Sequence, residues 1–132
     1  PGSLEVMGWR VGGDGLGVQF SEDIPRLIDT KMAVPLRRFL ADNGASLAEL
    51  DGFICHPGGA KVLDALEGVL GLPPGGLAVA RGVLRRYGNM SAATVLFVLD
   101  AVIKGEGGLR GRQLMTAMGP GFTASFALLE AE

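Results

Sequence analysis

The feature that most constrains the fold of this chain is an apolar segment between Ser91 and Lys104. Inside it, only Thr94 and Asp100 carry polar side chains. A helix that is apolar around its whole circumference must be covered by other elements on every side. The segment is also well short of the roughly 20 residues that a membrane-crossing helix needs. The sequence therefore predicts a helix buried inside a layered domain.

The first third of the chain predicts a hairpin followed by an interrupted helix. Residues 7–11 and 16–20 are two apolar runs around the turn Gly12-Gly13-Asp14-Gly15, which indicates a strand pair. Apolar residues at helical spacing then continue from Ile24 to Leu40. Pro35 lies inside this stripe and should kink or split the helix, because it lacks the N–H that an inner helical position donates.

The rest of the chain alternates strands and helices. A short buried strand at 52–55 precedes a helix that includes residues 61–70, in which Lys61, Asp64 and Glu67 are expected on the outward face. Residues 79–87 fit a strand as well as a helix. The last strands flank a glycine-rich turn: 113–118, Gly119-Pro120-Gly121 and 122–129. Strands and helices mixed around one buried helix indicate an α/β fold with a mixed sheet.

His56, the only histidine, is the first candidate for chemistry. It lies where the strand at 52–55 ends and the turn Pro57-Gly58-Gly59 begins. Loops at the ends of strands are common places for reactive side chains, and glycines there let a ligand approach the backbone closely. Taken alone, the position fits a hydrogen-bonded structural histidine as well as a catalytic one.

Asn89 is the second candidate, because it precedes the buried helix in the run Gly88-Asn89-Met90-Ser91-Ala92-Ala93. An isolated asparagine at such a place is more often a helix N-cap than a functional residue. The turn Gly119-Pro120-Gly121 is likewise most simply a tight connection between strands. None of the three motifs identifies a function by itself.

Together, the three motifs resemble type III polyketide synthases, the chalcone and stilbene synthase family, in order and spacing. The matching runs are Phe53-Ile54-Cys55-His56-Pro57-Gly58-Gly59, Tyr87-Gly88-Asn89-Met90-Ser91-Ala92-Ala93 and Met118-Gly119-Pro120-Gly121-Phe122. Gly8-Trp9, Gly15-Leu16 and Asp23-Ile24-Pro25 extend the likeness upstream, so it covers essentially all of residues 1–132. The resemblance implies the C-terminal half of a thiolase-like layered fold, with the segment 91–104 in its central layer.

The resemblance also implies that His56 and Asn89 are catalytic members of a Cys-His-Asn site, whose cysteine belongs to an N-terminal half absent from these residues. The full-length enzyme would condense a starter acyl-CoA with malonyl-CoA by decarboxylative Claisen condensation, and the isolated chain would be inactive. No metal and no cofactor is implied, because coenzyme A thioesters are the substrates. The implied partners are the N-terminal half and a second copy in a homodimer. Further residues are expected to bind substrate or coenzyme A: Gly58, Gly59, Lys61, Ser91, Gly119, Pro120 and Gly121.

Cys55, the only cysteine, precedes His56 directly but is not expected to be the nucleophile. Neighbouring side chains on a strand point to opposite faces. If His56 faces the site, Cys55 should face the core, where a free cysteine behaves as a small apolar residue.

Charge and composition exclude other classes of function. The formal net charge is −2, from 12 basic and 14 acidic residues, which leaves no basic stripe for nucleic acid or for an anionic membrane. The hydrophobic fraction is 48%, high enough to suggest a surface meant for a partner. The first residues have neither the basic start nor the apolar run of a signal peptide, so we expect a cytoplasmic protein.

Two alternatives stay open. A fatty-acid enzyme like ketoacyl-ACP synthase III shares a histidine and a Gly-Asn-x-Ser-Ala motif, but it typically carries Gln-Ala-Asn after the histidine, where this chain has Pro57-Gly58-Gly59. A non-catalytic remnant that binds a partner through its apolar surface would also fit. An upstream half with a reactive cysteine in the parent reading frame would favour the condensing enzyme.

Overall fold

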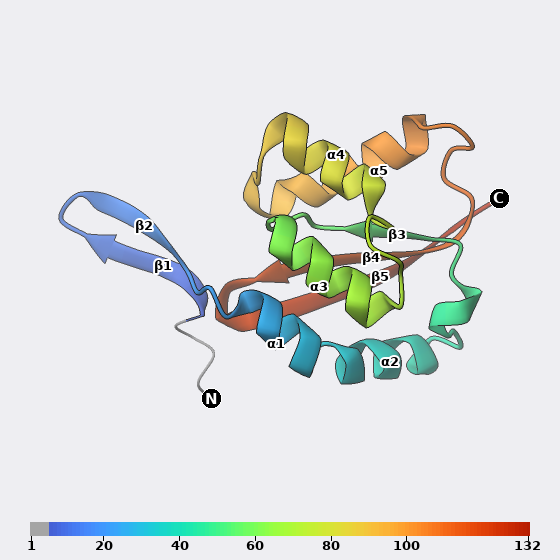
Figure 1. Cartoon of the computed structure of the whole chain (residues 1–132), viewed down its shortest axis with the longest axis horizontal. Helices are drawn as coiled ribbons and strands as arrows, with labels where there is room; N and C mark the ends of the chain where they lie inside the picture. Colours follow the sequence, from blue (N-terminus) through green and yellow to red (C-terminus); the bar gives the residue numbers. More distant parts are fainter. Residues whose placement is uncertain (1–5) are drawn as a thin grey trace.

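A three-stranded mixed sheet forms the centre of the computed structural model, which describes residues 6–132 (Figure 1). Strand β3 (Gly52–Cys55) runs parallel to β4 (Gly111–Gly119), and β4 pairs antiparallel with β5 (Thr123–Ala131). The short turn η3 (Pro120–Phe122) joins β4 to β5, and Gly121 in it has φ 68°, a left-handed conformation that glycine tolerates. The expected α/β fold with a mixed sheet is confirmed.

Two helices in tandem, α1 (Ile24–Lys31) and α2 (Ala33–Asp42), replace the single helical stripe. The break falls at Met32. In a continuous helix the Pro35 ring would clash with the carbonyl of Lys31, the residue just before this break. Helix α1 packs against α3 (Ala60–Leu70), and α2 approaches the sheet where the rings of Phe39 and Phe126 lie 5.5 Å apart. The predicted split at the proline is therefore confirmed.

The segment that fitted either a strand or a helix is α4 (Ala78–Tyr87). Its buried residues Ala80 and Val83 are three positions apart, as one face of a helix requires, and the last turn carries Arg85 and Arg86. A short 3₁₀ turn, η2 (Ser91–Ala93), then leads into α5 (Thr94–Lys104). Helices α4 and α5 lie together on one side of the sheet, opposite α1 and α2 (Figure 1).

Helix α5 packs against α4, β3 and β4, but part of its circumference is uncovered. Thr94, Val95 and Val98 are buried, whereas Leu96 is 56% exposed and Ile103 is 52% exposed. The expectation of a helix covered on every side is therefore wrong for residues 6–132 taken alone. The physical reason is that residues 6–132 offer α5 only one sheet and the neighbouring helix α4, and these do not reach Leu96 and Ile103.

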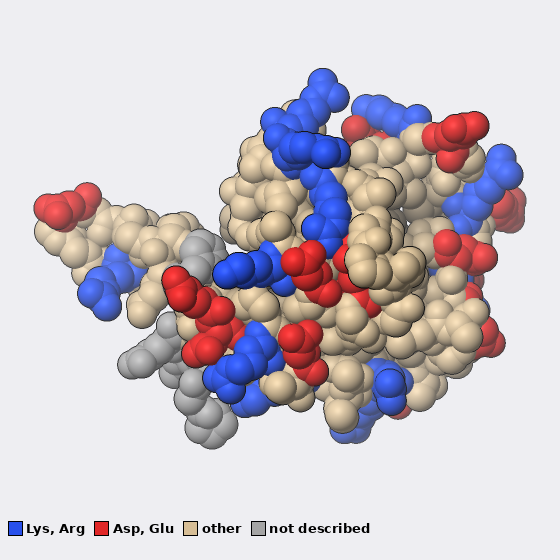
Figure 2. All heavy atoms as spheres, in the orientation of Figure 1, with Lys and Arg blue, Asp and Glu red and all other residues tan. Residues whose placement is uncertain are grey.

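The hairpin of β1 (Met7–Gly12) and β2 (Gly15–Phe20) projects away from the body of the molecule (Figure 1). Its antiparallel register pairs Trp9 with Val18 and Val11 with Leu16, which places these four side chains on one face of the ribbon. All four are at least half exposed, and Val11 reaches 80%. Figure 2 shows an acidic group at the tip of the hairpin and a basic group along its lower edge, with uncharged residues between them. The hairpin itself was predicted correctly, and its apolar face is a second uncovered surface.

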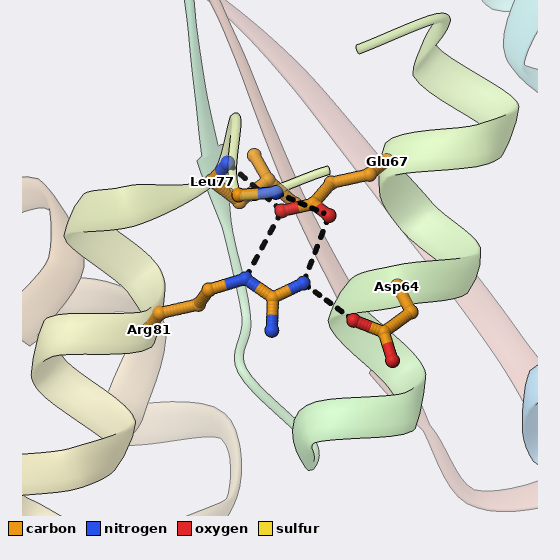
Figure 3. Close-up of polar contacts among 5 residues, drawn as sticks. Asp64, Glu67, Leu77 and Arg81 are labelled. Carbon is orange, nitrogen blue, oxygen red and sulfur yellow. Dashed lines mark hydrogen bonds and ion pairs between the residues drawn. The ribbon is translucent and has the colours of Figure 1, made fainter. Parts of the chain in front are cut away.

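Glu67 is buried rather than solvated, which corrects the expectation for helix α3. Its carboxylate accepts hydrogen bonds from the backbone N–H groups of Gly75 (3.0 Å) and Leu77 (3.1 Å) and from the Arg81 guanidinium at 2.8 and 3.1 Å (Figure 3). Arg81 also donates to Asp64 at 2.6 Å. These contacts lower the pKa of Glu67 to about 2. The ionised carboxylate on α3 thereby binds both the connecting loop and α4.

None of the helices within residues 6–132 is both long enough and apolar enough to span a membrane.

Candidate active site

His56 lies directly after β3 and extends its ladder by one residue. Its backbone N–H donates to the carbonyl of Thr116 on β4 at 2.8 Å, and its own carbonyl accepts from the N–H of Gly58 at 3.1 Å. This tight turn redirects the chain into helix α3. Only 6% of His56 is exposed, and its Nδ1 atom is buried with no hydrogen-bond partner among the described residues. Burial lowers the pKa of the imidazole below its ordinary value of 6.5, so the ring is mainly neutral at pH 7.

Asn89 lies between α4 and η2, and both ends of its side-chain amide are fixed. The Nδ2 group donates to the carbonyl of Gly58 at 3.0 Å, and Oδ1 accepts from the backbone N–H of Ser91 at 2.9 Å. The second Nδ2 hydrogen has no partner within residues 6–132. The asparagine therefore does not act as a helix N-cap for α5: its amide spans two loops and keeps one donor free.

One cavity brings the two candidates together, although they are 33 residues apart in sequence. The polar part of its lining consists of His56, Asn89 and Ser91, together with the backbone of Gly58. The remaining lining residues are apolar and come from four different elements: Met7, Ile24, Val62 and Met118. A small apolar cavity with a few converging polar groups is the usual form of a binding or catalytic site.

A second opening adjoins this cavity and shares four lining residues with it: Ile24, Gly58, Val62 and Asn89. Lys61 lines this opening, together with Ser21 and Glu22. The second opening therefore lies between the exposed Lys61 and the cavity that His56 lines.

The other predicted site residues lie near the cavity without lining it. Gly59 immediately precedes helix α3 in an extended conformation. Gly119 ends β4, and Pro120 and Gly121 form the turn η3. In this part of the chain the cavity wall is Met118, which directly precedes Gly119.

Cys55 faces the core, as the strand alternation predicts. It is fully buried within the hydrophobic core, and it is not among the residues that line the cavity. Burial raises the pKa of the Cys55 thiol to about 12, so the thiol is protonated at neutral pH. A protonated, inaccessible thiol is a poor nucleophile.

Sequence reasoning missed the apolar wall of the cavity and the part played by Thr94. Met7, Ile24 and Val62 come from separate elements, and nothing local in the sequence shows that they meet. The Thr94 hydroxyl donates to the carbonyl of Ser91 and accepts from the N–H of Met90, both at 2.8 Å. A threonine three residues after a loop serine is the one local signal that could have suggested such contacts.

The arrangement is suited to hold a developing negative charge on oxygen. It combines a buried imidazole and a neutral amide that offers a free N–H, in a small and mostly apolar cavity. Donors fixed before the reaction stabilise an oxyanion much better than water does. In this chain the imidazole of His56 is buried, whereas the Asn89 amide is exposed. Within residues 6–132, no group of three or more His, Cys, Asp or Glu side chains is placed to hold a metal ion.

Comparison with known proteins gives a consistent result. Residues 1–131 match the family model described as chalcone and stilbene synthases, C-terminal domain. The chain is 40% identical over 132 residues to the 1,3,6,8-tetrahydroxynaphthalene synthase of Streptomyces peucetius subsp. caesius, covering 98% of this chain and 34% of that protein. It is 38% identical over 131 residues to a chalcone synthase-like protein of Bacillus subtilis (strain 168), covering 98% and 36%.

The fold is similar to that of solved relatives. The crystal structure of PKS-I from the brown alga Ectocarpus siliculosus superposes with a TM-score of 0.87 at 25% identity, covering 99% of this chain and 36% of that one. This similarity confirms the thiolase-like fold class. The chain spans about a third of the length of the relatives it matches. With the family model matching nearly every residue, the chain belongs to the chalcone and stilbene synthase family, as its C-terminal domain.

Proposed function

We propose that this chain is the C-terminal part of a type III polyketide synthase that extends a starter acyl-CoA with malonyl-CoA. The observation that carries the proposal is the single cavity that joins His56 to Asn89, with the Asn89 amide fixed by Gly58 and Ser91. The proposed nucleophile is a cysteine of the N-terminal half. Cys55 is not a substitute, because its thiol is buried and protonated.

The proposed reaction starts with attack of that cysteine thiolate on the starter thioester, which releases coenzyme A and leaves an acyl-enzyme. Malonyl-CoA then loses carbon dioxide, and the electrons of the broken C–C bond form an enolate. His56 and Asn89 donate hydrogen bonds to the enolate oxygen. The enolate carbon attacks the acyl-cysteine carbonyl, the thiolate leaves, and the product is a coenzyme A thioester longer by two carbons.

The two donors differ in how they respond to charge. Asparagine donates without titrating, whereas an aspartate in its place would repel the enolate. The imidazole of His56 is mainly neutral in this chain, because burial lowers its pKa. A cysteine thiolate brought beside it would raise that pKa again and favour a thiolate–imidazolium pair.

We propose that coenzyme A enters through the second opening. Lys61 lines this opening, which places its ammonium group to meet the phosphates of the coenzyme A arm while the thioester end reaches His56. Gly58 carries no side chain, and a Cβ there would already contact Val62 at 3.4 Å.

We further propose that the rest of the polypeptide covers the apolar face of α5 and the apolar face of the hairpin. Both surfaces carry large exposed side chains, among them Trp9, Val11, Leu96 and Ile103. Relatives are about three times as long as this chain, so a full-length protein of that size has further residues that can pack on these two faces. The resemblance to the family also implies that two full-length copies form a homodimer.

The test uses the full-length protein, malonyl-CoA and a panel of acyl-CoA starters, with carbon dioxide release and coenzyme A release followed separately. Product masses that rise by two-carbon ketide units, without any acyl carrier protein, support the proposal. Condensation that requires malonyl-acyl carrier protein would point to a ketoacyl synthase instead. Absence of both acyl-enzyme formation and malonyl-CoA decarboxylation would contradict catalysis and favour a partner-binding remnant, for which the uncovered apolar faces are the supporting observation.

A further inference from the structure

Ser91 has an unusual backbone conformation at the edge of the cavity. Its φ angle is 61°, in the left-handed region that residues with a Cβ atom avoid. Such a conformation persists only when the surroundings hold it. Here both backbone groups of Ser91 are tied: its N–H donates to Asn89 Oδ1 at 2.9 Å, and its carbonyl accepts from Thr94 Oγ1 at 2.8 Å.

Thr94 supplies one of these ties from a fully buried position at the start of α5. None of its surface is exposed, and its hydroxyl uses both of its hydrogen-bonding functions. It donates to the carbonyl of Ser91 and accepts from the backbone N–H of Met90 at 2.8 Å. The hydroxyl therefore fixes two successive residues of the loop that follows Asn89.

We infer that Thr94 is a positioning residue for Asn89, an inference that rests on the proposed function of the Asn89 amide. The order of contacts runs from the Thr94 hydroxyl to the Ser91 backbone, and from the Ser91 N–H to Asn89 Oδ1. Holding Oδ1 on Ser91 leaves Nδ2 to bond Gly58 and to keep its second hydrogen for a ligand. Thr94 itself is not among the residues that line the cavity, so it acts through Asn89.

The test compares Thr94→Val with Thr94→Ser in the full-length protein. Valine keeps the shape of threonine but removes both hydrogen bonds, whereas serine keeps the hydroxyl. For Thr94→Val we expect kcat for malonyl-CoA decarboxylation to fall about 10²-fold, the effect of misplacing a group at a reacting centre. KM and the rate of starter loading onto the enzyme should change less than about 3-fold, because loading does not use Asn89. Thr94→Ser should decarboxylate malonyl-CoA at close to the wild-type rate, because it keeps the hydroxyl.

Hydrogen exchange measured by mass spectrometry gives a readout that does not depend on activity. In Thr94→Val, the peptide spanning residues 88–93 should exchange faster, while α4 should be unchanged, because only the loop loses its ties. If the variant perturbs the loop but the wild type never decarboxylates malonyl-CoA, the proposed function fails and the loop contact stands. Unchanged exchange together with unchanged kcat would overturn the inference, and so would an equal loss of loading and decarboxylation. If Thr94→Val does not fold, Thr94→Ala is compared with Thr94→Ser in the same assays of decarboxylation, loading and hydrogen exchange, and the same outcomes decide.

Discussion

The side-chain amide of Asn89 donates a hydrogen bond of 3.0 Å to the backbone carbonyl of Gly58, across 31 residues of sequence. Gly58 in turn donates its N–H to the carbonyl of His56 at 3.1 Å. Gly58 therefore connects the turn after β3 to the loop before α5 through its two backbone hydrogen bonds. This relationship keeps His56 and Asn89 in one cavity through contacts within this chain alone.

The first prediction concerns the protonation of His56. Because the chain has a single histidine, one ring-proton resonance in a proton NMR titration reports it. We expect a pKa below the ordinary 6.5, since burial disfavours the imidazolium. The unfolded chain then binds the proton more tightly than the folded chain, so stability is full above pH 6.5 and declines as the pH falls below it. A folded-state pKa above 6.5 would contradict the buried, unpartnered ring.

The second prediction separates Cys55 from its neighbour. With a pKa of about 12, the Cys55 thiol should resist iodoacetamide at pH 7.5 in the folded full-length enzyme. Cys55→Ser should leave turnover within about 3-fold and cost on the order of 1–3 kcal/mol of stability, the effect of placing a hydroxyl where a thiol packed. His56→Ala should abolish condensation. Alkylation of Cys55 in step with loss of activity, with protection by acyl-CoA, would contradict this assignment.

The third prediction concerns the buried carboxylate of Glu67. Glu67→Gln should lower the free energy of unfolding by about 1–3 kcal/mol in urea denaturation at pH 7, because charge-assisted hydrogen bonds become neutral ones. Asp64→Asn is the control: Asp64 bonds the same Arg81, but its side chain is 65% exposed, so the loss should stay below about 1 kcal/mol.

The pH dependence gives an independent check of Glu67. Its pKa is lowered from 4.5 to about 2 by Arg81 and two backbone N–H donors. The stability that it contributes is therefore complete above pH 4.5 and lost as the pH falls from 4.5 toward 2. Glu67→Gln should remove this part of the acid sensitivity. An equally steep acid response in the variant would show that Glu67 is not the titrating group.

The fourth prediction is that the isolated chain self-associates through its uncovered apolar faces. Leu96, on α5, is 56% exposed, so Leu96→Glu should shift sedimentation toward monomer and reduce binding of a hydrophobic dye. Val34→Glu is the matched control, because Val34 is 76% exposed but lies on α2, away from α5. A wild-type chain that stays monomeric and excludes the dye at high concentration would contradict the prediction.

Much of the fold could be predicted from local pattern and turn chemistry. The hairpin, the split near Pro35 and the strands around Gly119-Pro120-Gly121 each depend on residues close in sequence. Strand alternation placed Cys55 in the core once His56 was taken to face the site. Such features need no knowledge of what packs where, because neighbouring residues already restrict the backbone.

The parts that could not be predicted depend on contacts between distant segments. Glu67 was expected in solvent, because a helical pattern does not show that Arg81 and a loop will close over it. The high hydrophobic fraction predicted an uncovered apolar surface, but which face of α5 stays uncovered could not be foreseen, since periodicity shows which residues are apolar and not how many layers surround them. The bond from Asn89 to Gly58 was likewise hidden, because it joins two loops 31 residues apart.

The most direct test of the central claim is to measure Asn89→Ala in the full-length enzyme, in separate assays of starter loading and of carbon dioxide release from malonyl-CoA. If Asn89 holds the enolate oxygen, decarboxylation should fall roughly 10²–10³-fold, the usual cost of one such donor, while formation of the acyl-enzyme should change only a few-fold. An equal loss in both steps, or no loss in decarboxylation, would contradict the account.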